Sequence, residues 1–209
     1  PSPDLLLLDE PFSNLDAELR KRLSLEVRDI LKELGISAIL VTHDQLEAFA
    51  FSDHIGLLYN GKLQQWDTPF NLYHEPSNRL VADFIGEGSF LPGVIGTELN
   101  TVTTELGTLM GNRAYAWPPG TPVEVLLRPD DIVLSDFGGI SATIEKKVFS
   151  GSATLYTLRL PTGSHVEALL PSHRDFAINE VVKINTEADH LIAFGREELH
   201  QSENKPRSN

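Results

Sequence analysis

The sequence predicts an α/β unit over residues 1–86, an all-β unit over residues 87–200 and a polar tail at 201–209. Up to residue 86, short apolar runs alternate with helical patterns, which is typical of a parallel sheet covered by helices. From residue 87 onward, short β-rich runs are broken by glycine and proline, which is typical of a small barrel or sandwich. A chain of 209 residues has room for one large or two small domains.

The first unit opens with a continuous apolar run, Leu5–Leu8. Such a run predicts a strand that is buried on both faces. Asp16 can then cap a helix, and Gly35 can end it. The apolar residues of this helix recur at helical spacing: Leu19, Leu23, Val27, Ile30, Leu31 and Leu34.

A second buried strand is predicted over Ile36–Thr42, followed by a helix that begins after His43. Asp44 and Glu47 have the spacing of a capping box, which supports that start. Further along, two paired strands and two short helices are predicted: Ile55–Tyr59 and Lys62–Trp66 around the turn Asn60-Gly61, then Pro69–His74 and Arg79–Ile85.

The second unit has several strand patterns and one clear hairpin, in which Pro161-Thr162-Gly163 joins two alternating runs. Examples of the predicted strands are Val123–Leu127, Ile132–Leu134, Ala142–Phe149, Thr154–Leu160 and His165–Leu169.

Composition excludes several classes of function. The net charge of −13 argues against a nucleic-acid surface, which needs clustered Lys and Arg. There is no cysteine, so disulfides and thiolate metal sites are excluded, and the seven histidines show no ligand-like cluster. No apolar run approaches the roughly 20 residues of a membrane helix.

Two carboxylates, Asp9 and Glu10, follow the first strand directly. Parallel sheets bind their ligands at this carboxyl edge. An ATPase needs one acid there to help hold Mg²⁺ and a second to orient the attacking water. The alternative is a buried strand whose acids are only solvated.

A loop and a histidine extend this pattern. The loop Ser13-Asn14-Leu15-Asp16 precedes the first helix, where it could simply cap that helix. His43 ends the second strand, so it should lie at the same sheet edge as Glu10, where an imidazole can bond a phosphate oxygen. A structural histidine is the alternative.

Together and in this order, the three segments resemble the ATP-binding-cassette (ABC) family of P-loop ATPases. LLLLDEP is similar to its Walker B strand, SNLD to its D-loop and VTHD to its switch-histidine loop. The resemblance implies ATP and Mg²⁺ as cofactors, Asp9 for water-mediated Mg²⁺ binding, Glu10 as general base and His43 as sensor of the γ-phosphate. It implies that residues 13–16 meet a second copy of the subunit.

The phosphate loop G-x-x-x-x-G-K-[ST] and the LSGGQ signature of this family are absent from the 209 residues. We therefore expect an N-terminal half of the same subunit as a partner of this chain. We also expect the chain alone to be inactive as an ATPase.

The segment Gly61–Glu87 and the run LLRPDDIVLS resemble the C-terminal parts of importer ATPases that carry an oligonucleotide-fold-like TOBE domain. The signature residues are Arg128, Pro129 and Asp130; a strand stopped by Pro129 is the alternative. GEGSFLPG is most similar to ferric-iron importers, so ferric iron is the expected cargo, with sulfate, polyamines and sugars as alternatives.

This resemblance implies transmembrane permease subunits and, indirectly, a periplasmic or extracellular binding protein as partners. It implies a peripheral location on the cytoplasmic face of the membrane, and no nucleic acid. Two other classes are alternatives: a purely regulatory or dimerisation module, and a DNA-repair or chromosome ATPase, which the acidic charge and the following β unit disfavour.

Overall fold

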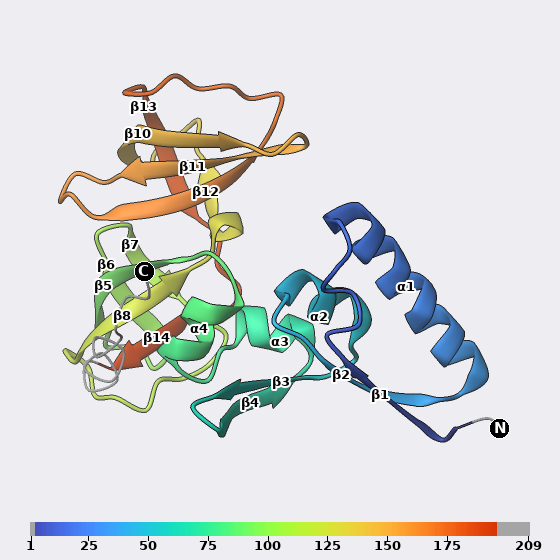
Figure 1. Cartoon of the computed structure of the whole chain (residues 1–209). Helices are drawn as coiled ribbons and strands as arrows, with labels where there is room; N and C mark the ends of the chain where they lie inside the picture. Colours follow the sequence, from blue (N-terminus) through green and yellow to red (C-terminus); the bar gives the residue numbers. More distant parts are fainter. Residues whose placement is uncertain (1–2, 196–209) are drawn as a thin grey trace. The chain divides into compact units, whose positions relative to one another are not determined.

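The computed structural model describes residues 3–195, which form two compact units, one up to Tyr73 and one from His74 onward (Figure 1). This division lies earlier in the chain than the expected change near residue 86. The ranges 1–86 and 87–200 stay predictions, and the tail at 201–209 lies outside the described residues.

The first unit alternates strands and helices as the sequence predicts, with a parallel pair β1-β2 and an antiparallel pair β3-β4. Its elements are β1 (Leu5–Asp9), α1 (Ala17–Leu34), β2 (Ser37–Val41), α2 (Gln45–Phe51), β3 (Ile55–Tyr59), β4 (Lys62–Asp67) and α3 (Pro69–His74).

Local capping fixes the helix boundaries of this unit. The Asp16 carboxylate accepts a hydrogen bond of 2.9 Å from the amide of Leu19 at the start of α1. Gly35 ends α1 with a φ of +67°, a left-handed conformation that glycine adopts without strain. Asp44 caps α2 in the same way, by accepting 3.0 Å from the amide of Glu47.

The prediction that the first two strands are buried on both faces is wrong for the described residues. β1 and β2 pair only with each other, so neither is a central strand here. Alternate side chains form one exposed apolar face, in which Leu7 is 69% exposed and lies opposite Ile39 in the register. Leu5 and Val41 complete this face.

The exposed apolar face predicts self-association of the chain. Each large aliphatic side chain left in water forgoes about 1.5–3 kcal/mol of burial. Light scattering over a concentration series should show masses above the monomer, and Leu7→Lys should shift the distribution toward the monomer. A wild-type chain that stays monomeric at high concentration would refute this expectation.

The second unit is built from two five-stranded antiparallel sheets with the orders β12-β11-β10-β13-β9 and β14-β8-β5-β6-β7 (Figure 1). A short helix precedes them. The elements are α4 (Arg79–Ile85), β5 (Ser89–Ile95), β6 (Thr101–Thr104), β7 (Gly107–Met110), β8 (Pro122–Leu127), the 3₁₀ turn η1 (Pro129–Asp131), β9 (Ile132–Leu134), β10 (Ile140–Phe149), β11 (Ala153–Arg159), β12 (His165–Pro171), β13 (Val181–Thr186) and β14 (Ile192–Gly195).

One core joins the two sheets, as the predicted all-β class requires. Leu91 and Val125 come from one sheet, and Tyr156 and Ile184 from the other; all four are almost fully buried. The Tyr156 hydroxyl donates to the carbonyl of Arg174 at 3.1 Å, so burying its oxygen costs no hydrogen bond. Among residues 3–195, no helix is long and apolar enough to cross a bilayer.

Candidate functional site

The carboxyl ends of β1 and β2 meet at one edge because the two strands are parallel and in register. Asp9 pairs with Val41, the last residue of β2. The amide of Glu10 then donates to the carbonyl of Val41 at 2.9 Å, which extends the pairing by one residue. The residues that follow the two strands are thereby brought together, as the sequence predicts.

Glu10 leaves the strand with an unusual backbone conformation. Its φ is +46°, in the left-handed region that residues other than glycine seldom adopt. The carbonyl of Glu10 accepts hydrogen bonds from both the amide and the hydroxyl of Ser13, at 3.3 and 3.0 Å, and buried Phe12 lies inside this turn. Backbone strain of this kind is concentrated at functional sites, where the surrounding structure holds it.

The structure brings Glu10 and His43 into direct contact. Nδ1 of His43 lies 2.7 Å from Oε1 of Glu10. The histidine side chain is 77% exposed and the glutamate side chain 35%, so the pair is open to solvent on one side. The hydrogen bond from His43 to the Glu10 carboxylate, together with the negative charge of that group, raises the pKa of His43.

We expect the His43 ring to titrate above its ordinary value of 6.5. A histidine with a raised pKa binds its proton more tightly in the folded state, so the pair stabilises folding at pH values below 6.5. That stabilisation is lost as the pH rises through the raised pKa. An NMR titration of the ring shows the pKa directly; Glu10→Gln should lower it, and a wild-type pKa at or below 6.5 would contradict the assignment.

Asp9 is exposed at the end of β1, and its carboxylate has no hydrogen-bond or ion-pair partner among residues 3–195. Mg²⁺ prefers oxygen ligands and is usually held by one or two carboxylates plus phosphates and water. The described residues contain no cluster of three or more metal-binding side chains. The exposed carboxylate of Asp9 can supply one oxygen ligand to such an ion.

The loop of residues 13–16 is held at both ends. Ser13 bonds back to Glu10, and Asp16 caps α1. Between them, Asn14 is exposed and Leu15 is half-buried, with its carbonyl accepting a hydrogen bond from the guanidinium of Arg20 at 3.0 Å. The loop thus presents Ser13 and Asn14 outward from a fixed backbone.

The TOBE signature residues belong to the second unit, where two of the three are buried. Arg128 is 3% exposed, and its Nη1 lies within hydrogen-bond distance of the carbonyls of Ala82, Gly86 and Glu87, at 3.3, 3.0 and 2.9 Å. Ala82 lies inside α4, and Gly86 and Glu87 follow its C-terminal end. Pro129 is buried in η1, and Asp130 is exposed.

Gly88 packs closely against Arg128. A Cβ added at position 88 would lie 2.9 Å from Cδ1 of Leu126 and 3.1 Å from Nη1 of Arg128. A larger residue at position 88 would therefore require the side-chain ends of Leu126 and Arg128 to shift.

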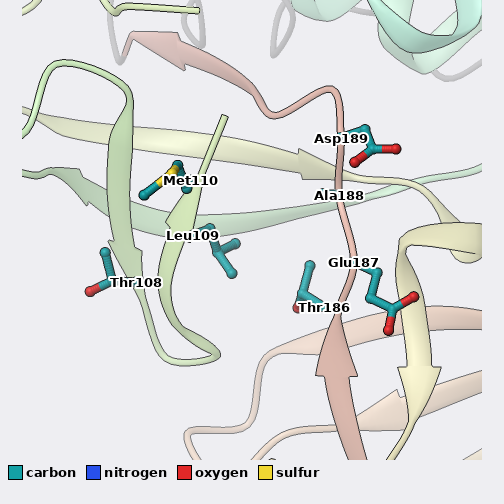
Figure 2. Close-up of a pocket in the computed structure, with 7 residues that line it drawn as sticks. All are labelled: Thr108, Leu109, Met110, Thr186, Glu187, Ala188 and Asp189. Carbon is teal, nitrogen blue, oxygen red and sulfur yellow. The ribbon is translucent and has the colours of Figure 1, made fainter. Parts of the chain in front are cut away.

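A separate cleft of about 530 Å³ lies in the second unit, between the end of β7 and the segment after β13 (Figure 2). Its lining residues are Thr108, Leu109, Met110, Thr186, Glu187, Ala188 and Asp189. The two carboxylates and the absence of Lys or Arg from this lining make the cleft unsuited to a phosphate group.

Sequence reasoning missed Arg20, which contacts Leu15 in the loop of residues 13–16 and Asp44 in the loop that carries His43. One signal was available: a cation in the first turn of a helix is disfavoured by the helix dipole, so Arg20 needed a partner elsewhere. That partner is Asp44, next to His43.

This chain is similar to a known domain family and to several known import ATP-binding proteins. The TOBE domain family matches residues 125–194. Spermidine/putrescine import ATP-binding protein PotA of Rubrobacter xylanophilus is 36% identical over 205 residues, which cover 92% of this chain and 54% of that protein. PotA of Mesorhizobium japonicum is 39% identical over 168 residues, with coverages of 78% and 46%.

PotA 2 of Pseudomonas aeruginosa is 35% identical over 181 residues, with coverages of 81% and 50%. A crystal structure of the cytoplasmic molybdate-binding protein ModG with molybdate bound covers 58% of this chain and 99% of its own, at 11% identity and a TM-score of 0.44. The chain spans about half the length of the curated relatives it matches. It belongs to the ATP-binding subunits of ABC importers that carry a TOBE domain, and it corresponds to a C-terminal part of such a subunit.

Proposed function

We propose that this chain is part of the ATP-hydrolysing subunit of an importer, in which hydrolysis drives substrate uptake. The observation that carries this proposal is the 2.7 Å contact between Glu10 and His43 at the carboxyl edge of two parallel strands. The relatives, all named import ATP-binding proteins, support it.

Each residue of the edge has a distinct role in this proposal. Glu10 acts as general base and orients the attacking water, and His43 donates a hydrogen bond to the γ-phosphate. Asp9 helps to hold Mg²⁺, which when bound neutralises charge on the phosphates. A second copy of the subunit faces the loop formed by Ser13, Asn14, Leu15 and Asp16.

The 209-residue chain alone should release no phosphate from ATP above background. It contains no phosphate loop, so nothing in it presents the γ-phosphate to Glu10. Steady-state phosphate release with Mg²⁺ and ATP, measured on the chain and on the full-length subunit, checks this. Turnover by the chain that Glu10→Gln abolishes would refute it, and an inactive full-length subunit would refute the proposed function.

For the cargo, we propose a polyamine in place of the expected ferric iron. The relatives compared are named for spermidine and putrescine, and none of them supports iron. Uptake of labelled spermidine by cells that lack the endogenous gene and carry the full-length one tests the cargo. Competition by putrescine but not by ferric iron is expected; the reverse would restore the iron assignment.

The proposed partners are the N-terminal half of the subunit, a second copy of the subunit and the permease subunits, with a binding protein acting indirectly. The proposed location is the cytoplasmic face of the membrane, where such subunits bind permeases peripherally.

A regulatory or dimerisation role is the second candidate for the chain taken alone. The two-sheet core of the second unit supports it, because that core is complete within the described residues. An inactive chain that still associates with the full-length subunit would favour this role.

A further inference from the structure

Arg20 connects the two loops of the candidate site. One guanidinium nitrogen, Nη2, donates to the carbonyl of Leu15 at 3.0 Å, in the loop of residues 13–16. The other, Nη1, forms an ion pair with the Asp44 carboxylate, directly after His43. The side chains of Arg20 and Asp44 are 25% and 24% exposed, so this pair is less screened by solvent than a surface ion pair.

Asp44 is itself a fixed point in the loop that carries His43. Its Oδ1 accepts from the amide of Glu47, and its amide donates to the hydroxyl of Thr42 at 3.1 Å. That hydroxyl donates in turn to the carboxylate of Glu47, which is 4% exposed, at 2.8 Å. The residues on both sides of His43 are therefore anchored to the first turn of α2, and Arg20 joins that anchor to the other loop.

The fork of the guanidinium explains why an arginine occupies this position. Two separate nitrogens reach two acceptors at once, with the planar geometry that only arginine has. A cation in the first turn of α1 opposes the helix dipole, so local helix stability does not explain it. The contacts with Leu15 and Asp44 explain why a cation occupies position 20.

We propose that Arg20 is a positioning residue that couples the loop of residues 13–16 to His43 and keeps the imidazole within reach of Glu10. This inference rests on the proposed function for its effect on hydrolysis, but the coupling itself is a property of this chain. It implies that a displacement of the loop, for example by a second subunit, is transmitted to His43 through Asp44.

Hydrogen exchange on this chain tests the coupling without ATP. The amides of Leu15 and Glu47 both have acceptors, Phe12 and Asp44, and so report on the two loops. Arg20→Lys keeps the charge but loses the fork, and it should speed exchange at both amides by about tenfold, while the interior of α1 stays protected. Arg28→Lys is the matched control, since Arg28 lies on the same helix and pairs with Asp53.

An equal loosening of the whole of α1, or no change at either loop, would overturn the coupling. In the full-length subunit, Arg20→Lys should lower kcat about tenfold and leave the KM for ATP unchanged. Adding Asp44→Asn, which keeps the helix cap but removes the charge, should lower kcat no further, because both changes break one connection. Additive losses would overturn the inference, whereas a wild-type subunit without ATPase activity would refute only the proposed function.

Discussion

A Glu10→Gln variant of the full-length subunit is expected to hydrolyse ATP at least about 100-fold more slowly than the wild type while still binding ATP. The amide has nearly the same shape as the carboxylate but cannot accept the proton of the attacking water. It can still occupy the strained turn after β1, because Glu10 is held there by backbone bonds to Val41 and Ser13. The lower rate of hydrolysis should therefore come from the missing base and not from a changed structure.

Phosphate release and equilibrium nucleotide binding, measured on the same preparation, separate a loss of hydrolysis from a loss of ATP binding. Glu33→Gln is the matched control: it makes the same substitution near the end of α1, on an exposed side chain outside the site. Wild-type kcat in Glu10→Gln would remove the general-base assignment. A parallel loss in Glu33→Gln would show that the effect is not specific to the site.

Arg128→Met is expected to destabilise the second unit by about 3 kcal/mol or more. The substitution fills a similar volume but leaves the carbonyls of Ala82, Gly86 and Glu87 without their shared donor. Of these residues Ala82 is buried and Gly86 is half-buried. A buried acceptor that loses its partner is costly, and the buried Ala82 lies inside α4.

Urea unfolding of the chain in a Trp66→Phe background measures this loss, because the remaining Trp117 packs against the core of the second unit. Arg159→Met is the control: Arg159 is half-exposed and pairs with Glu145 at the surface, so its loss should cost less than about 1 kcal/mol. A change of that small size for Arg128→Met would mean that water replaces the guanidinium without penalty.

The elements of the first unit could be predicted because their signals are local. The apolar run of β1, the cap at Asp16 and the stop at Gly35 each act within a few residues. The contact between Glu10 and His43 followed from one topological rule, that parallel strands end at the same edge.

Other features depend on contacts that the local sequence does not encode. β5 was not predicted because it contains Pro92 and Gly93, which usually argue against a strand, yet it lies between β8 and β6. Arg20 and its partner Asp44 lie 24 positions apart along the chain, and no periodicity of the sequence indicates their contact. The exposure of Leu7 was missed for a related reason: an apolar run does not say how many neighbours its strand has.

The most direct test of the central claim is ATP-dependent uptake of labelled spermidine into proteoliposomes that contain the full-length subunit, its permease partners and the binding protein. We expect accumulation with the wild type, and an initial rate of uptake at least about 100-fold lower with Glu10→Gln at the same ATP concentration. Equal uptake by the two proteins would contradict the claim that hydrolysis at the Glu10–His43 edge drives import.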